Sequence, residues 1–239
     1  MRKNVIILTV GLSGSSVLTG FISRAGYWTG DNTAKKEYDT YENLELVGLD
    51  QKLIQEAGYR GDYTSEFSEE AVRQLRSVYD KVDKAPYRQF LLKCDDHKPW
   101  IWKDPRLWLT IPFWKNLLEL DQCKFIVLSR DLLQSWTSIL LRRQVWTYGY
   151  LKHYENSIRA TITHWLEENR VPYLHLRYED LILQPEETIR SLNGYLDTSL
   201  TLQDVRAIYN QPLYKKPRSN WDFLKAVAIY VKNYPERLR

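Results

Sequence analysis

A loop of small residues follows the first apolar run of the chain. GLSGSS occupies 11–16, directly after 5–10 and before apolar positions that recur at helical spacing. A strand, a glycine-containing loop and a helix in this order can bind an anion, because the helix N-terminus offers unpaired N–H groups and the positive end of its dipole. Gly11 and Gly14 let the backbone approach such an anion closely. Further hydroxyl donors belong to Ser13, Ser15 and Ser16.

This loop lacks the lysine of an ATP- or GTP-binding loop. The pattern G-x-x-x-x-G-K-[ST] places Lys directly after the second glycine, whereas Ser15 follows Gly14. A triphosphate needs that lysine and a Mg²⁺ site, so the loop predicts an anion of lower charge, such as a nucleotide 5′-phosphate. Two alternatives stay open: an unconventional P-loop kinase or hydrolase, and an ordinary strand–helix turn with a serine N-cap.

Charged side chains follow three other short apolar runs. IWK at 101–103 leads into Asp-Pro-Arg, KFIVLS at 124–129 leads into Arg130, and the run within 171–180 ends in Tyr-Glu-Asp. In parallel α/β sheets ligands bind at the carboxyl ends of the strands. We therefore expect these residues to lie at one rim with the glycine-containing loop.

The elements that must position this rim alternate along the chain. Strands are expected at 5–10, 101–103, 124–130 and 171–180, the last with a loop. Helices are expected at 15–26, 49–57, 69–82, 107–118, 131–143, 150–169 and 185–195, with Pro112 as a kink or boundary. The polar stretch 30–43 is expected to be a loop. This alternation predicts an α/β fold with a central parallel sheet and helices on both faces.

Length and composition indicate a globular protein, which we expect to be one domain over 1–239. A net charge of +4 favours a small anionic ligand over nucleic acid. Nine Trp and 17 Tyr are explained either by core packing or by an aromatic acceptor cleft. Cys94 and Cys123 form no CxxC pair, and the chain shows neither a signal segment nor a membrane span. We expect a cytoplasmic protein, or else a catalytic domain of a longer chain, with no metal site and no membrane partner.

Four stretches taken in order resemble one enzyme family. GLSGSS, WKDPRLWLTIPFWKNLL, CKFIVLSRDLLQSWTSIL and LHLRYEDLILQPEETI are similar to motifs of the sulfotransferases that use 3′-phosphoadenosine-5′-phosphosulfate (PAPS), most closely the soluble bacterial-type branch. The resemblance covers most of 4–195. It implies a P-loop-like fold and metal-free transfer of a sulfuryl group from PAPS to a hydroxyl or amine of a small-molecule or carbohydrate acceptor, leaving adenosine 3′,5′-bisphosphate (PAP).

The resemblance also implies roles for individual residues. Those that would cradle the 5′-phosphosulfate are Ser13, Gly14, Ser15 and Ser16. Arg130 and Ser138 would hold the 3′-phosphate, with Ser135 as the rival of Ser138. Tyr178 would contact the adenine or, alternatively, cap the core. Glu179 and Asp180 are interpreted as structural anchors. Arg218, within the basic cluster YKKPRSN, is a further nucleotide-binding candidate.

Leu12 departs from the family pattern. The family usually has Lys or Arg immediately before the Ser-Gly of the loop, where the cation stabilises charge on the leaving phosphate. Lys103 and Arg106 are the candidates to replace it, unless Lys-Asp-Pro-Arg is only a turn in which Asp104 caps the next helix. A third possibility is a nucleotide-binding protein that has lost turnover.

A base must take the proton of the acceptor. YDTYENLELVGL resembles the family's Tyr/Phe-Glu-Asn/Asp motif, which places Glu42 near the acceptor as the catalytic base. Glu42 is otherwise a carboxylate at a helix start. The other candidates are His97 and the pair Asp95–Asp96, although a surface turn explains His97 equally. The sequence leaves the acceptor's identity and the oligomeric state open.

Overall fold

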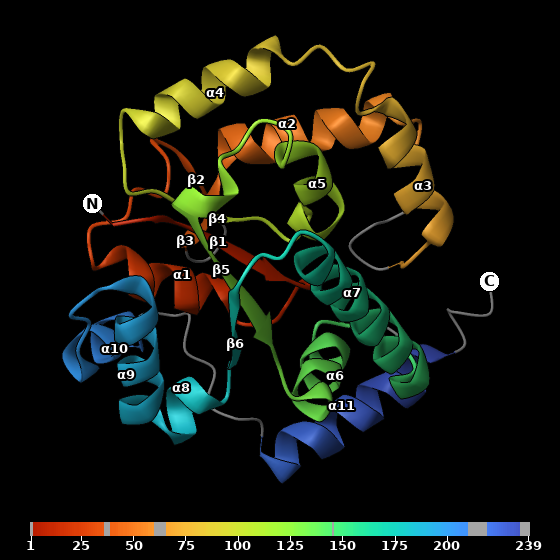
Figure 1. The fold of residues 1–239 in the computed structure, drawn as a ribbon. Coiled ribbons are helices and arrows are strands. Elements are labelled where there is room, and N and C mark those ends of the chain that lie inside the picture. The colour runs from red at the N-terminus through yellow and green to blue at the C-terminus, as the bar shows by residue number, and fades with distance from the viewer. Residues whose placement is uncertain (1, 36–38, 60–65, 145, 210–218, 235–239) are drawn as a thin grey trace.

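A parallel four-stranded sheet forms the centre of the protein. The structure, a computed structural model, describes residues 2–35, 39–59, 66–144, 146–209 and 219–234. The strands stand in the order β4-β1-β5-β6 (Figure 1). They are β1 (Asn4–Thr9), β4 (Ile101–Lys103), β5 (Cys123–Ser129) and β6 (Tyr173–Arg177). All three pairings are parallel. The predicted α/β fold is therefore confirmed, including the four strands expected from the sequence.

Strand β1 is central, and its side chains alternate between two hydrophobic cores. Ile6 and Leu8 belong to the core on one face, whereas Val5 and Ile7 belong to the core on the other. Successive side chains of a strand point to opposite faces, so a strand covered on both faces must be apolar throughout. This explains why every residue of 5–10 except Thr9 is apolar.

Five helices cover the first face of the sheet (Figure 1). They are α2 (Leu44–Glu56), α3 (Glu69–Val78), α4 (Ala85–Asp95), α5 (Leu107–Trp114) and α7 (Tyr148–Glu168). The core beneath them is rich in aromatic rings. Trp102 of β4 stacks on Trp100 with ring centroids 4.5 Å apart and meets Trp114 edge-on at 4.9 Å. Core packing therefore accounts for these tryptophans.

The second face is covered by α1 (Ser15–Ser23), α8 (Asp180–Leu183), α9 (Pro185–Leu196) and α10 (Leu202–Tyr209). Beyond the sheet, α11 (Asn220–Asn233) packs on α6 (Leu132–Leu141) (Figure 1). Trp136 of α6 contacts the rings of Phe223 and Tyr230 on α11, at 6.0 and 6.1 Å between centroids. A short 3₁₀ helix, η1 (Leu120–Gln122), precedes β5.

The prediction of a loop over 30–43 was wrong. This stretch contains an antiparallel pair, β2 (Thr33–Lys35) and β3 (Asp39–Asn43). Its side chains are mostly polar and do not show the apolar–polar alternation that predicts a strand. The pair is instead positioned by contacts with residues distant in sequence: the Tyr41 ring packs so closely on Gly20 of α1 that a Cβ at Gly20 would lie 2.6 Å from the ring. Helix α2 also begins earlier than predicted, because Asn43 caps it by accepting from the Glu45 N–H at 3.0 Å.

Helices α4, α8, α10 and α11 were not predicted, and several predicted helices end earlier in the structure. α1 stops at Ser23 and α5 at Trp114. Pro112 lies inside α5 rather than at its boundary. Among the helices of the described residues, none combines the length and apolar character that crossing a bilayer demands.

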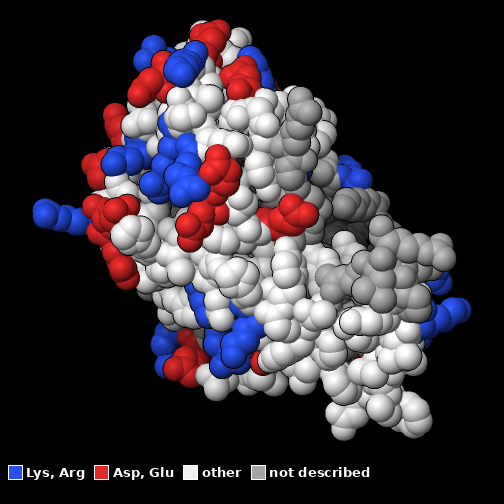
Figure 2. Space-filling model, turned by 90° about the vertical axis from the view of Figure 1, so that its right-hand side faces the viewer, with Lys and Arg blue, Asp and Glu red and all other residues white. Residues whose placement is uncertain are grey.

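The charged surface is uneven on the face that carries α3 and α7. Figure 2 shows acidic and basic side chains interspersed over its upper left part and a smaller charged group at the lower left, whereas the lower right part is largely uncharged. That lower part lies at the level of α6 and α11 in Figure 1, and the exposed side chains of α11 include Trp221, Leu224 and Val231. The apolar character of α11 therefore extends beyond the face that packs on α6.

Asp50 of α2 is a carboxyl group enclosed by the first core. It is fully buried, and Oδ1 accepts a hydrogen bond from the indole N–H of Trp114 at 2.8 Å. Burial raises the pKa of Asp50 well above its usual range, and the nearby charge of Asp104 raises it further. The folded protein thus favours the neutral acid at this position.

We predict that Asp50→Asn changes how stability depends on pH. A folded-state pKa above the unfolded value gives stability that is complete below the unfolded pKa and is lost as pH rises through the folded pKa. Between the unfolded and the folded pKa of Asp50, the free energy of unfolding of the wild type should therefore fall by up to about 1.4 kcal/mol per pH unit. The free energy of unfolding of Asp50→Asn should not show this fall. Urea unfolding of both proteins between pH 4 and pH 8 measures the difference. Parallel pH profiles would contradict the assignment.

Candidate functional site

The carboxyl ends of the four strands meet at one cavity of about 640 Å³. The loop after β1 lines it together with Lys103 at the end of β4, Arg130 after β5 and Tyr178 after β6. The rim expected from the strand ends is therefore present. The lining includes four cationic side chains and two acidic ones, namely Lys103, Arg106, Arg130, Arg142, Glu42 and Glu155. This excess of positive charge suits an anionic ligand.

Gly14 determines the shape of the loop. It is the N-cap of α1 in the left-handed region, at φ 85°, and no side chain caps the helix. A Cβ at this position would lie 2.2 Å from the Tyr178 ring. The alternative of a serine N-cap is therefore not what the structure shows. The positive end of the α1 dipole reaches the cavity without a capping side chain, as an anion site requires.

Contacts with the strand ends hold the first half of the loop in a strained form. Leu12 has φ 64°, a conformation that costs a bulky residue about 1–3 kcal/mol. Its carbonyl accepts a hydrogen bond from Arg130 Nη1 at 2.9 Å. Ser13 is buried, and its hydroxyl is hydrogen-bonded to that of Thr9 at 2.6 Å. Ser13 thus supports the loop from below, and its hydroxyl is already engaged.

Lys103 joins three separate segments at the edge of the cavity. Its side chain is only 4% exposed, and its ammonium donates to Glu42 Oε1 at 2.6 Å, to Ser16 Oγ at 3.2 Å and to the carbonyl of Thr40 at 3.2 Å. Glu42 comes from β3 and Ser16 from the first turn of α1. The structure therefore brings together the predicted cation, the predicted base and the loop.

Arg106 also lines the cavity but is held by its own turn. Asp104 is buried, and its Oδ1 accepts from the Arg106 N–H at 2.9 Å and from Arg106 Nη1 at 2.8 Å. Asp104 thus stabilises the turn before α5, as expected for a structural role of Lys-Asp-Pro-Arg, but it does not cap the helix, because the N-cap is Arg106 and no side chain caps it. A structural turn at Lys-Asp-Pro-Arg is compatible with Lys103 as the replacement cation, because the turn leaves the Lys103 side chain directed to the loop.

Arg130 is held from several sides at the other end of the cavity. Glu179 Oε1 lies 3.8 Å from its Nε, while Oε2 of the same carboxylate accepts from the Asp131 N–H at 3.0 Å. The guanidinium lies 5.4 Å from the centre of the Tyr178 ring. Glu179 is thus the structural anchor that the sequence suggested. Tyr178 both lines the cavity and belongs to the second core.

The two serines of α6 have different surroundings. Ser138 lines the same cavity as Arg130, whereas Ser135 hydrogen-bonds to Glu155 of α7. The structure therefore favours Ser138 over its rival as the hydroxyl that faces a ligand.

One predicted residue of the described part of the chain is not brought to this site. His97 follows α4, stacks on Trp28 with ring centroids 4.6 Å apart and lies before β4, at the amino end of the sheet. The cavity is at the carboxyl end, so the placement of His97 argues against a catalytic role, and Asp95 and Asp96 flank it there. Arg218 lies outside the described residues.

Sequence reasoning missed the wall of the cavity that α7 and the end of α6 provide. Its residues are Arg142, Gln144, Trp146, Leu151, Tyr154 and Glu155. Burial raises the pKa of Glu155 to about 7, against the lowering effects of the Ser135 hydrogen bond and of Arg130. The available signal was weak: Glu155 is an acidic residue next to the buried stripe of α7 that contains Leu151, Tyr154 and Ile158.

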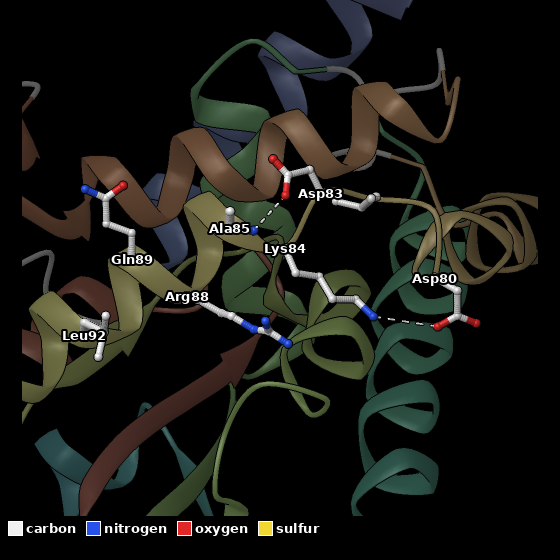
Figure 3. A pocket seen from close by; sticks show the side chains of 8 residues that line it. Asp80, Asp83, Lys84, Ala85, Arg88, Gln89 and Leu92 are labelled. Atoms are coloured by element: carbon white, nitrogen blue, oxygen red, sulfur yellow. Dashed lines mark hydrogen bonds and ion pairs between the residues drawn. The ribbon is translucent and has the colours of Figure 1, made fainter.

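A second hollow of about 550 Å³ lies along the start of α4 (Figure 3). There Lys84 pairs with Asp80 at 3.9 Å, and Asp83 accepts from the Ala85 N–H at 2.9 Å. None of the predicted site residues lines this hollow. The predicted site residues that the structure brings together therefore line the larger cavity.

Comparisons with known proteins agree with this fold. A family model described as the sulfotransferase family matches residues 13–202. A sulfotransferase domain from the curacin biosynthetic pathway superposes with a TM-score of 0.57 and 14% identity, over 90% of this chain and 81% of that chain. A sulfotransferase domain from the Synechococcus PCC 7002 olefin synthase gives 0.52 and 16%, over 95% and 94%. No curated protein matches the chain.

We predict that Gly14→Ala destabilises the protein and deforms the loop. The substitution places a Cβ against the Tyr178 ring at a positive φ, and the backbone strain alone costs about 1 kcal/mol. Gly11→Ala is the matched control, since a Cβ there meets nothing within 4 Å and should change stability by less than about 0.5 kcal/mol. Denaturant unfolding compares the two variants. Equal effects would show that Gly14 is not constrained by Tyr178.

Proposed function

Because the chain belongs to the sulfotransferase family, we propose that it transfers a sulfuryl group from PAPS to a hydroxyl or amine of a small-molecule or carbohydrate acceptor. The observation that carries the proposal is the buried ammonium of Lys103, which contacts both Ser16 of the loop and the carboxylate of Glu42. A cation at the anion-binding loop and a base beside it are what sulfuryl transfer requires.

The residues around the cavity fit the nucleotide. Gly14 gives the loop a close backbone approach at the uncapped start of α1, where the 5′-phosphosulfate would be held by 13–16. Arg130 and Ser138 line the same cavity and would hold the 3′-phosphate. A guanidinium offers a planar fork of donors for phosphate oxygens, and the hydroxyl adds one more donor.

Lys103 supplies the cation that the family usually places at the position of Leu12. Bound PAPS supplies the sulfuryl group, and its departure leaves charge on the 5′-phosphate. An ammonium has three protons, and those of Lys103 are directed to Glu42, Ser16 and Thr40. An anion at the loop must therefore replace one of these acceptors, most directly the hydroxyl of Ser16. The buried cation then stabilises the charge that develops there.

Glu42 is the group placed to take the acceptor's proton. Its carboxylate lies 2.6 Å from the ammonium of Lys103, so the same contact orients the base. The pair links the two halves of the reaction, because Lys103 acts on the leaving phosphate and Glu42 on the attacking hydroxyl or amine. The absence of a metal requirement, the cytoplasmic location and the acceptor class stay predictions.

One alternative is a non-catalytic nucleotide-binding protein of the same fold. Leu12 favours this alternative, because the loop carries no cation of its own and the Leu12 carbonyl accepts a hydrogen bond from Arg130. A P-loop kinase is a weaker alternative, since the lysine after Gly14 is missing. Turnover with labelled PAPS separates the enzyme from the binding protein, and a thermal shift with ATP–Mg²⁺ tests the kinase.

We predict that PAP stabilises the protein more than AMP does. A ligand of the native state adds RT ln(1 + [L]/Kd), about 2.7 kcal/mol at 100 times Kd, and only PAP carries the 3′-phosphate. Thermal shifts at equal concentrations measure the difference. Arg130→Ala should weaken PAP binding about 10- to 150-fold and bring the two shifts together, with circular dichroism as the check on folding. Equal shifts for PAP and AMP on the wild type would remove Arg130 and Ser138 from the nucleotide site.

We predict that Lys103→Met lowers turnover about 10²- to 10³-fold with little loss of PAP affinity, because the ammonium acts mainly on charge that develops during the reaction. Turnover of labelled PAPS at saturation is the measurement. Lys98→Met is the matched control: Lys98 pairs with Asp95 at the surface, outside the cavity. Lys103→Arg keeps a positive charge at this position and is the check that the pocket still folds when Lys103 is replaced.

Leu12→Lys tests the same assignment from the other side. It restores the residue that the family usually has, and it should recover part of the rate lost in Lys103→Met. If Lys103→Met turns over as the wild type does, Lys103 is not the replacement cation. If only Leu12→Lys turns over and the wild type does not, the binding-protein alternative is correct.

A further inference from the structure

Glu155 is an acidic residue in a cavity that otherwise suits an anion. It lies on α7, lines the cavity and hydrogen-bonds to the hydroxyl of Ser135 on α6, one turn before Ser138. Neither the family resemblance nor the mechanism above gives it a role. An acidic group at this position needs an explanation, because a carboxylate beside a bound phosphate is repelled.

The charges around Glu155 place it at the Arg130 end of the cavity. Arg130 comes from the end of β5, Glu179 from the end of β6 and Arg159 from α7 itself, and all three interact electrostatically with Glu155. Arg142 of the α6 end lines the same wall. Lys103 and Glu42, in contrast, are joined to Ser16 of α1. Glu155 thus belongs to the end assigned to the 3′-phosphate.

We propose, on the basis of the function proposed above, that Glu155 is a third member of the 3′-phosphate site, in which its protonated carboxyl donates a hydrogen bond to a phosphate oxygen beside Arg130 and Ser138. A protonated carboxyl has one O–H donor and can still accept from Ser135 through its other oxygen. The neutral form leaves the guanidinium of Arg130 to neutralise the ligand. The ionised form would instead compete with the phosphate for Arg130.

The protonation state of Glu155 supports this assignment. Burial is the main cause that raises its pKa to about 7, so the side chain is about half neutral at neutral pH before any ligand binds. A phosphate that favours the neutral form raises this pKa further, and binding then takes up a proton. Each pH unit well above 7 weakens binding by up to about tenfold, which amounts to about 30-fold between pH 6 and pH 8.5.

The test is PAP binding measured by isothermal titration calorimetry between pH 6 and pH 8.5, for the wild type and Glu155→Gln. Glutamine keeps the shape and an N–H donor but does not ionise. The phosphate of PAP also titrates in this range, but equally for both proteins. The Kd of the wild type divided by the Kd of Glu155→Gln should therefore be close to one at pH 6 and about 30 at pH 8.5, because only the wild type binds PAP more weakly as Glu155 ionises. Glu167→Gln, an exposed change on the same helix, is the control and should follow the wild type.

A second measurement needs no variant, in case Glu155→Gln does not fold. Titration of the wild type in two buffers of different ionisation enthalpy gives the protons taken up on binding. At pH 8 uptake for PAP should exceed that for AMP, which lacks the 3′-phosphate. Equal uptake after correction for each ligand's own titration would overturn the assignment.

The outcomes separate the two proposals. If the wild type binds PAP and transfers sulfuryl groups, but its pH profile coincides with that of Glu155→Gln, Glu155 is not part of the 3′-phosphate site and the proposed function stands. If Glu155→Gln binds PAP as the wild type does but loses turnover, Glu155 acts on the acceptor and the assignment is overturned. If PAP binds at no pH, both proposals fail.

Discussion

The buried ammonium of Lys103 is the constraint around which the rest of the site is arranged. A charge that is almost fully removed from water is tolerated only when it is paired and hydrogen-bonded. Its partners Thr40 and Glu42 come from β3, and Ser16 comes from the first turn of α1. The short polar strands β2 and β3, which have little core of their own, are therefore fixed against the sheet by this charge as well as by the Tyr41 ring.

Arg130 plays the corresponding structural part at the other end of the cavity. It contacts the Leu12 carbonyl, the Glu179 carboxylate and the Tyr178 ring, and so ties the ends of β5 and β6 to the loop after β1. Both cations are thus oriented by the folded chain before a ligand arrives. Such preorganisation is the main way in which an enzyme makes fixed charges effective, because they need not reorient during the reaction.

The sequence predicted the sheet and the strand-end rim well, because both depend on local patterns. An apolar run such as 5–10, followed by glycines and serines, has few other interpretations in a chain of alternating elements. The pairing of Lys103 with the loop also followed from topology. The hairpin of β2 and β3 could not be foreseen in this way, since its position depends on Gly20 and Lys103, far away in sequence.

The cavity wall formed by α7 could not be predicted from the sequence for the same reason, because its position depends on packing between elements. Glu155 faces the cavity only because α7 packs beside α6, and nothing in the local pattern distinguishes it from an exposed acidic residue. His97 shows the opposite error: its residue type suits catalysis, but the direction of β4 carries Lys103 to the cavity and leaves His97 at the other end of the sheet. Residue type alone predicts chemistry poorly when the strand direction is not considered.

The hydrogen bond between Arg130 and Leu12 joins residues that are 118 positions apart. Because the cavity wall is built from the ends of all four parallel strands, the loop cannot open far without disturbing β1 at the centre of the sheet. Amide hydrogens in this part of the chain should then exchange with solvent through large cooperative openings rather than local fraying. The loop at 11–16 should in this respect behave as part of the core of the sheet rather than as a mobile surface loop.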